Sequence, residues 1–346
     1  MTLRIGLIGC GAAGQAHAAV YRGIEGVELR AVADTDVAAA TRLAAAAGCP
    51  ALSPEELLAA DLDVVAIATP TPTHAALVQE AARRGKDILC ETPLARTLDQ
   101  AREAVAACRE AEVRLIPLHL NAFMPPLRRA GELLAGGSLG RVGVVRITRR
   151  RPGVPAGAWH RSLPASGGVI LDLLAQDIAF LIGCCGRVER VYAASTAYRE
   201  LLDGEYAQVS LRLQNGVIAH LDGNWLPGDQ GGDELEIAAA NGLIAWSTEN
   251  TAPLRLTLNA EPGKRILTSP VDEDMYIAGL RAALRALEDD AASLAAAPSA
   301  SVTSPAGDAP LPNVTPPTGV EVALHTLEVA LAALESAATG RVFTIA

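Results

Sequence analysis

The chain has 346 residues, half of them hydrophobic, and a formal net charge of −10. At about 150 residues per domain this length predicts two domains, each with its own core. The negative charge argues against nucleic acid or an anionic membrane as a partner. No run approaches the roughly 20 uninterrupted apolar residues of a membrane span and no secretory signal is visible, so we expect a cytoplasmic protein. The six cysteines form no C-x-x-C pair and no metal-ligand spacing with histidine, so we expect no metal site.

Apolar strand patterns alternate with helical patterns over the first 120 residues. The expected strands are Leu3–Ile8, Val27–Ala33, Val64–Ala68, Ile88–Cys90 and Arg114–Leu118, and the expected helices are Gly14–Arg22, Val37–Ala47, Pro54–Ala60, Thr73–Arg84 and Leu98–Ala111. This alternation predicts βαβ units and a parallel sheet, which is an α/β Rossmann-type domain.

After residue 122 the pattern changes to alternating segments joined by Asn215-Gly216 and Asn241-Gly242, which favour hairpins. The expected elements are strands 142–148, 207–213, 216–223, 234–239, 243–247 and 341–345 and a helix over 320–338. We therefore expect a dinucleotide-binding domain over 1–122. An α+β domain with a mostly antiparallel sheet follows over 123–346, and the Pro/Ala/Ser-rich stretch 296–318 is expected to be a flexible insertion.

The first expected strand runs directly into Gly9-Cys10-Gly11-Ala12-Ala13-Gly14, a G-x-G-x-x-G pattern that opens a helix. The first glycine permits a tight turn, the second permits close approach of a pyrophosphate, and the third permits helix–strand packing. The N–H groups of the helix N-terminus, at Ala12, Ala13 and Gly14, suit phosphate binding. The pattern indicates a dinucleotide site, although a glycine turn that binds no nucleotide has the same sequence.

Asp34 ends the second strand, 20 residues after Gly14, where an acidic side chain accepts hydrogen bonds from ribose hydroxyls. No arginine directly follows it to neutralise a 2′-phosphate, which favours NAD over NADP. The third strand ends in Thr69-Pro70, at the carboxyl edge where ligands bind. His74 follows, and it either faces this crevice or only begins a helix.

Four arginines, Arg146, Arg149, Arg150 and Arg151, alternate between the two faces of one strand if that strand continues so far. They suit a carboxylate or phosphate of a substrate. A solvated sheet edge or a subunit interface also explains them, and we favour that interpretation.

Longer motifs carry a family resemblance. They are Ile5-Gly6-Leu7-Ile8-Gly9-Cys10-Gly11, Val32-Ala33-Asp34, Thr69-Pro70 with His74, Cys90-Glu91-Thr92-Pro93-Leu94-Ala95, Ser166-Gly167-Gly168-Val169-Ile170-Leu171-Asp172 and Leu334-Glu335-Ser336-Ala337-Ala338-Thr339-Gly340-Arg341. Together they resemble the Gfo/Idh/MocA oxidoreductases, which include glucose–fructose oxidoreductase and inositol dehydrogenases. The resemblance implies that Glu91 and Pro93 border the cofactor, and that dimers or tetramers form through the second-domain sheet.

The chain departs from the family at its catalytic positions. Thr92 stands where the family's Glu-Lys-Pro motif has lysine, and Gln176 stands where Asp-x-x-x-His, beginning here at Asp172, has histidine. Neither supplies an ammonium or an imidazole, and the only lysines are Lys86 and Lys264. A third departure is Ala122, where many relatives carry arginine.

Four residues are candidates to replace the lost proton-handling groups: Asp172, Asp177, His119 and His160. Each also has a structural interpretation, as an orienting residue, a helix charge, a hydrogen-bonded histidine at the domain junction and a surface loop residue respectively. We favour His119 and Asp172, with Thr92 and Gln176 as hydrogen-bonding partners of the substrate.

The sequence therefore predicts an NAD(P)-dependent oxidoreductase that acts on a sugar, cyclitol or related polar metabolite with an unusual acid/base set. One alternative is an NAD(P)-binding pseudoenzyme that serves as a sensor or regulatory subunit. Another is an imine reductase, or an enzyme that performs elimination through transient oxidation.

Overall fold

The computed structural model describes residues 2–155, 157–197, 204–226, 228, 231–250, 254–259, 265–268, 274–288 and 319–345. These residues divide into two compact units. The predicted flexible insertion 296–318 lies outside the described residues, as does Lys264.

The first unit is built on a six-stranded sheet with strand order β3-β2-β1-β4-β5-β6, and every pairing in it is parallel. Its strands are β1 Leu3–Ile8, β2 Val27–Ala33, β3 Ala51–Leu52, β4 Val64–Ile67, β5 Asp87–Glu91 and β6 Leu115–Leu118. Its helices are α1 Ala12–Tyr21, α2 Val37–Ala47, α3 Pro54–Ala59, η1 Thr71–Thr73, α4 His74–Arg83 and α5 Leu98–Glu110. This order and direction confirm the predicted Rossmann-type α/β domain.

Local sequence explains the boundaries of these helices. Ser53 caps α3 in a capping box with Glu56, and Pro54 occupies the first turn. Asp36 caps α2 by accepting from Ala38 N and Ala39 N, and the left-handed Gly48 ends that helix. α1 begins two residues earlier than expected, at Ala12, so the glycine loop is shorter and its N-cap is Gly11.

Helix α9, Met275–Glu288, corrects the expected domain division. It follows the second-domain strands in sequence but belongs to the first unit, together with the start of α10 up to Leu324. Leu280, Leu284 and Leu287 of α9 join the buried apolar cluster formed with α1, α2 and the sheet. The apolar face of α9 thus completes the core of the Rossmann unit. A single domain boundary at residue 122 does not describe this, because the chain goes back to the first unit at α9.

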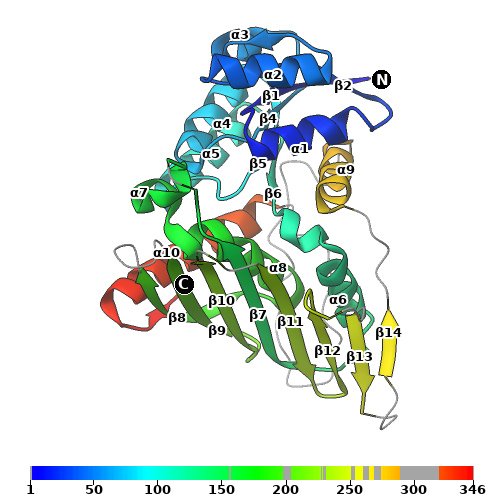
Figure 1. Cartoon of the computed structure of the whole chain (residues 1–346), viewed down its shortest axis with the longest axis vertical. Coiled ribbons are helices and arrows are strands. Elements are labelled where there is room, and N and C mark those ends of the chain that lie inside the picture. Colours follow the sequence, from blue (N-terminus) through cyan, green and yellow to red (C-terminus); the bar gives the residue numbers. More distant parts are fainter. Residues whose placement is uncertain are drawn as a thin grey trace. The chain divides into compact units, whose positions relative to one another are not determined.

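The second unit is built on a nine-stranded sheet, β14-β13-β12-β11-β7-β10-β9-β8-β15, in which only the β7–β10 pair is parallel (Figure 1). The strands are β7 Val142–Pro152, β8 Val188–Ala197, β9 Glu205–Leu213, β10 Ile218–Leu226, β11 Gly232–Ala239, β12 Gly242–Ser247, β13 Leu254–Leu258, β14 Arg265–Thr268 and β15 Phe343–Thr344. The helices are η2 Leu120–Phe123, α6 Pro125–Ala135, η3 Trp159–Arg161, α7 Leu163–Ser166, η4 Val169–Leu174, α8 Ala175–Cys185 and α10 Val320–Thr339. The predicted α+β class with a mostly antiparallel sheet is confirmed.

Both predicted Asn-Gly turns join antiparallel strands, but only one glycine has the expected conformation. Gly216 has φ +89°, whereas Gly242 is not in the positive-φ region. A Cβ on Gly242 would lie 2.2 Å from the Thr257 carbonyl oxygen on β13. Close approach of the neighbouring strand therefore explains Gly242.

Described helices cover one face of this sheet, and no described helix packs on the other, which we call the bare face. Val145, Ile147, Leu221 and Ile237 are buried on the covered face, against which η4 packs, with α8 contacting η4. Two helical stretches of the described residues, 163–185 and Val320–Thr339, are long and apolar enough to cross a membrane by length and composition. The most apolar window of the first is 72% buried inside the protein, which explains its composition as that of a core helix.

Candidate functional site

The three glycines of the loop after β1 have different surroundings: two are closely packed and one faces open space. Gly9 has φ +103°, and a Cβ on it would lie 2.3 Å from the Ala68 carbonyl oxygen. A Cβ on Gly14 would lie 1.9 Å from the Gly9 oxygen, whereas a Cβ on Gly11 would meet no heavy atom within 4 Å. The first and third glycines are thus required by packing, and the second leaves a cradle that a side chain would fill.

The N-terminus of α1 adjoins this cradle. Its N-cap is Gly11, no side chain caps it, and its first turn carries no acidic residue. The helix dipole and the N–H groups of Ala12, Ala13 and Gly14 therefore meet no side-chain anion from the helix itself. These features fit the pyrophosphate of a dinucleotide.

Asp34 is fixed beside the same loop. Its Oδ2 accepts from Cys10 N at 2.7 Å and its Oδ1 accepts from Asp36 N at 2.9 Å. Within the described ranges the Asp34 carboxylate forms no ion pair, and the neighbouring carboxylate is Asp36. The sequence prediction that Asp34 lies at the nucleotide end of β2 is consistent with this placement.

His74 lies behind the crevice, contrary to one of its two expected roles. It is 1% exposed, with Nδ1 2.8 Å from the Pro93 carbonyl oxygen and Nε2 2.7 Å from the Thr69 carbonyl oxygen. Burial lowers the pKa of His74, against the raising effect of these two carbonyls and of Glu91. The ring therefore ties the loop after β4 to the loop after β5, and is too buried to contact a ligand directly.

Glu91 is held from helix α1. Its Oε1 lies 2.8 Å from His17 Nε2, and His17 Nδ1 lies 3.2 Å from the Tyr21 hydroxyl. Sequence reasoning missed His17, although its i, i+4 spacing with Tyr21 on a helix that starts at the glycine loop was visible. The segment Glu91-Thr92-Pro93, which contains a cis Thr92–Pro93 peptide bond, is thus held at Glu91 by His17 and at Pro93 by His74.

Two of the predicted catalytic residues meet in the first unit. Thr92 Oγ1 donates to the Leu118 carbonyl oxygen at 3.2 Å and lies 3.4 Å from His119 Nδ1. His119 is 2% exposed, its Nε2 has no hydrogen-bond partner in the part of the chain that the structure describes, and burial lowers its pKa to about 3. His119 is therefore neutral at pH 7: its single N–H can orient the Thr92 hydroxyl, but the ring is not an imidazolium that could act as a general acid.

Asp172 and Gln176 belong to the second unit. Asp172 lies in η4, a π-helical turn, and Gln176 lies in the first turn of α8. Both are half-buried, as is Leu173, while Leu174 and Ala175 between them are buried. Asp172 and Gln176 thus lie on the more accessible side of this helical segment.

Two contacts seat η4 on the sheet. Val169 N donates to Glu205 Oε1 at 3.1 Å. A Cβ on Gly223 of β10 would lie 2.7 Å from Val169 Cγ1, so this glycine lets η4 approach closely. The π-helical geometry at a predicted catalytic aspartate agrees with the frequent occurrence of π turns at functional sites.

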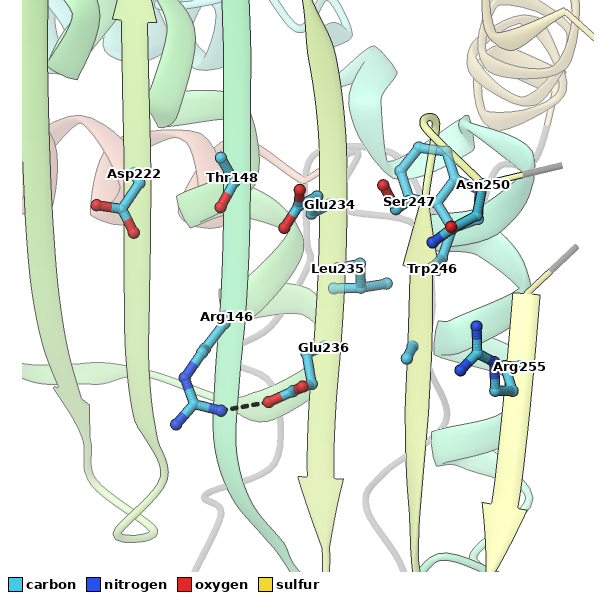
Figure 2. A pocket seen from close by; sticks show the side chains of 11 residues that line it. Arg146, Thr148, Asp222, Glu234, Leu235, Glu236, Trp246, Ser247, Asn250 and Arg255 are labelled. Atoms are coloured by element: carbon cyan, nitrogen blue, oxygen red, sulfur yellow. Dashed lines mark hydrogen bonds and ion pairs between the residues drawn. The ribbon is translucent and has the colours of Figure 1, made fainter. Parts of the chain in front are cut away.

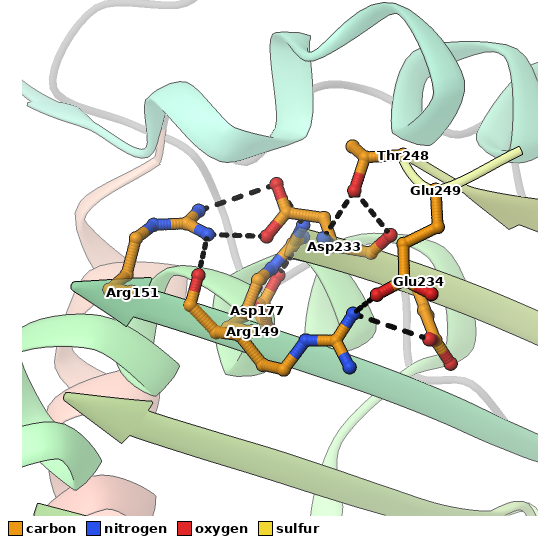
Figure 3. Close-up of polar contacts among 8 residues, drawn as sticks. Arg149, Arg151, Asp177, Asp233, Glu234, Thr248 and Glu249 are labelled. Carbon is orange, nitrogen blue, oxygen red and sulfur yellow. Dashed lines mark hydrogen bonds and ion pairs between the residues drawn. The ribbon is translucent and has the colours of Figure 1, made fainter. Parts of the chain in front are cut away.

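Asp177 is not available as a replacement acid or base, because it forms a buried ion pair. Arg149 and Asp177 are both fully buried, with Nε to Oδ2 at 2.9 Å and Nη2 to Oδ1 at 2.5 Å (Figure 3). Asp233 extends the network by accepting from Arg151 Nη1 at 2.6 Å. Burial makes Asp177 and Arg149 structural residues.

The arginine cluster is therefore not a solvated sheet edge. β7 is the central strand of the nine, flanked by β10 and β11. Arg146 pairs with Glu236 and Arg150 with Glu249 on one face, while Arg149 and Arg151 lie on the other, as the alternation predicted. β7 is therefore a central strand whose arginines form ion pairs on both faces, and the interpretation as a sheet edge is wrong.

His160 lies within an aromatic group rather than alone on the surface. Its ring centroid is 4.1 Å from that of Trp159 and 6.5 Å from that of Trp225 on β10. Burial lowers the pKa of His160, and Ser166 Oγ donates to its carbonyl oxygen at 2.8 Å. This cluster presents aromatic surface and one imidazole in the second unit.

The parallel sheet, the glycine cradle and Asp34 define a dinucleotide-binding oxidoreductase domain joined to an α+β domain. Residues 3–119 match the oxidoreductase family described as having an NAD-binding Rossmann fold, and residues 127–245 match the GFO/IDH/MocA C-terminal domain. The chain belongs to the Gfo/Idh/MocA oxidoreductase family, which confirms the resemblance found in the sequence.

Relatives align over most of the chain. Inositol 2-dehydrogenase of Rhizobium meliloti (strain 1021) is 32% identical over 290 residues, which cover 80% of this chain and 84% of that protein. Myo-inositol 2-dehydrogenase of Thermotoga maritima is 28% identical and covers 76% and 80% respectively. The crystal structure of GenD2 from gentamicin A biosynthesis, in complex with NAD, has a TM-score of 0.79 and 26% identity, covering 100% of this chain and 97% of that one.

Proposed function

We propose that the protein is an NAD-linked oxidoreductase that acts on a sugar, cyclitol or related polar metabolite. The observation that carries the proposal is the open cradle at Gly11, beside a helix N-terminus without a side-chain cap and beside Asp34. The cofactor would be held by the glycine loop, the start of α1 and the end of β2, at Gly9, Gly11, Ala12, Ala13, Gly14 and Asp34. The two bordering loops contain Thr69, Pro70, Glu91 and Pro93. The names of the relatives, inositol 2-dehydrogenase among them, support the substrate class.

The preference for NAD over NADP rests on charge. The carboxylates of Asp34 and Asp36 lie at the end of β2, and Asp34 has no cationic partner among the described residues. A 2′-phosphate at this position would face two carboxylates, whereas ribose hydroxyls donate hydrogen bonds to one of them.

The acid/base set is proposed to be unusual. NAD supplies a hydride acceptor when bound. Thr92 offers a neutral hydroxyl that His119 helps to orient, and Gln176 offers an amide. Asp172 is the ionisable member of the predicted set that remains accessible, so it is the candidate base.

A regulatory, cofactor-binding pseudoenzyme is the second candidate function. The observation that favours it is the neutral His119, because an imidazole whose burial lowers its pKa to about 3 supplies no acid at pH 7. Imine reduction and redox-assisted elimination place different demands on proton transfer. They remain candidate reactions of the same site.

Calorimetry tests cofactor binding. The wild-type protein is expected to bind NADH with micromolar affinity, more tightly than NADPH, and Gly11→Ala is expected to weaken this binding at least tenfold without changing the melting temperature. Gly23→Ala is the matched control, because a Cβ there meets only the Val20 oxygen at 3.6 Å. Absence of NADH binding by the wild-type protein would refute the proposed function.

Turnover separates the two candidate functions. NADH formation is measured with a panel of polyols, aldoses and cyclitols, and NADH oxidation with ketoses and imines. Turnover of any of these supports the enzyme, and tight NADH binding without turnover supports the regulatory subunit. The double variant Thr92→Lys with Gln176→His tests why turnover would be absent: a gain of polyol oxidation would show that only those two groups were missing.

We further propose that the bare sheet face pairs two copies of the chain into a dimer or tetramer. Tyr192, Tyr206 and Ile218 are 38–43% exposed on adjacent strands of this face. A polar groove beside them carries both charges: Arg146, Arg255, Asp222, Glu234 and Glu236 (Figure 2). Light scattering is expected to show a dimer or larger assembly that Tyr192→Glu with Ile218→Glu dissociates, and a monomeric wild-type protein would contradict this.

A further inference from the structure

The His74 ring has two acceptors and no donor among its ring contacts. Nδ1 lies 2.8 Å from the Pro93 oxygen and Nε2 lies 2.7 Å from the Thr69 oxygen. A peptide carbonyl oxygen only accepts hydrogen bonds, so each contact requires an N–H on the ring. A neutral imidazole has one N–H, and in either tautomer it sets a nitrogen lone pair against the other carbonyl oxygen.

We propose that His74 is held as an imidazolium that donates to both carbonyls and keeps a fixed positive charge beside the Glu91-Thr92-Pro93 segment. His74 is then a positioning residue. It joins the two loops expected to border the cofactor. It also provides a positive charge next to Thr92, which stands where the family has a lysine. Only the catalytic meaning of this charge rests on the proposed function; the charge state itself does not.

Burial opposes the charge and two features favour it. Burial is the largest influence and holds the pKa of the ring below its usual value, while the two carbonyl contacts and the Glu91 carboxylate act in the opposite direction. For the neutral ring, however, one of two short contacts is repulsive, and no other hydrogen-bond partner of the ring is present in the described residues. Both contacts become charge-assisted hydrogen bonds in the imidazolium, which are the stronger kind.

Glu91 provides the counter-charge. Its carboxylate acts on His74 and is also bonded to His17, which with Tyr21 faces it from α1. Tyr276 of α9 packs against His17, with ring centroids 6.0 Å apart. Among these groups Glu91 is the only carboxylate, so it is the counter-charge available to an imidazolium at His74.

His119 is an internal comparison. It is buried to a similar degree, at 2% exposed, but its Nδ1 lies 3.4 Å from the Thr92 hydroxyl rather than against a carbonyl, and its Nε2 has no hydrogen-bond partner among the described residues. Burial alone therefore acts on it, and that ring is neutral at pH 7. The two histidines should differ in charge because their hydrogen-bond partners differ, although their burial does not.

Nitrogen NMR of the cofactor-free protein tests the proposal. In protein labelled with ¹⁵N-histidine, long-range ¹H–¹⁵N spectra at pH 8 distinguish a doubly protonated ring from a ring with one bare nitrogen. We expect the ring whose signals are lost in His74→Gln to be doubly protonated. His119→Phe is the matched control and should remove a ring with one bare nitrogen.

Two results would overturn the proposal. If no ring of the wild-type protein is doubly protonated at pH 8, the proposal is overturned, even if His74→Gln does not fold. If the signals lost in His74→Gln belong to a neutral ring, it is overturned as well. The experiment uses neither cofactor nor substrate, so a failure of the proposed function leaves its outcome unaffected.

Discussion

The burial of His119 makes the stability of the protein depend on pH in a calculable way. Burial lowers the pKa of His119 from 6.5 to about 3, so between these values the unfolded chain binds a proton that the folded chain does not. Stability is therefore fully present above pH 6.5 and is lost as the pH falls toward 3. One pKa unit corresponds to about 1.36 kcal/mol, so lowering the pH from 7 to 5 should cost about 2 kcal/mol through this residue.

Denaturation measured at both pH values tests that magnitude. Urea unfolding followed by circular dichroism gives the free energy of unfolding at pH 7 and pH 5 for the wild-type protein and for His119→Phe, whose ring does not titrate. The pH-dependent loss should be about 2 kcal/mol smaller in His119→Phe than in the wild type. His220→Phe is the control, because His220 is only half-buried on the bare sheet face, with its Nδ1 3.1 Å from Ser210 Oγ. An equal loss in His119→Phe and the wild type would refute the burial argument.

Three further predictions concern other contacts. Arg149→Met should lower the free energy of unfolding by about 3–5 kcal/mol because it leaves buried carboxylates without their partner, and adding Asp177→Leu should recover most of that loss; urea unfolding of the single and double variants measures both. Gly14→Ala should cost at least about 2 kcal/mol in the same assay, because its Cβ would overlap the Gly9 oxygen, and an unchanged stability would contradict the loop geometry. Asp34→Ala should weaken NADH binding about 10–100-fold and narrow the preference over NADPH, as measured by calorimetry.

The parts of the site that sequence predicts are those built from neighbouring residues. The glycine loop and the Asp34 strand end each depend on a few consecutive residues, and both lie where expected. The second-unit strands were predicted less completely: β8, β13 and β14 were missed, and β7 extends four residues further than expected. Alternation shows which face a residue occupies, but not where a strand ends.

Long-range pairs explain what sequence does not predict. His17 meets Glu91 across 74 residues, and Arg149 meets Asp177 across 28, so no local pattern connects either pair. Asp177 and His74 were candidate functional residues because their types and positions fit, and burial decides against direct contact with a ligand for both. The position of helix α9 is also not predicted by local sequence, because its apolar face indicates a buried helix without indicating which core it completes.

The central claim is that this chain carries out NAD-linked redox chemistry without the lysine and histidine of its family. The most direct measurement is NADH formation by the purified wild-type protein with NAD and a panel of cyclitols and aldoses. NADH formation with at least one of them, reduced at least tenfold by Asp172→Asn and also reduced by Thr92→Val, is the predicted result. Tight NAD binding with no NADH formation from any of them would contradict the claim and favour a regulatory role.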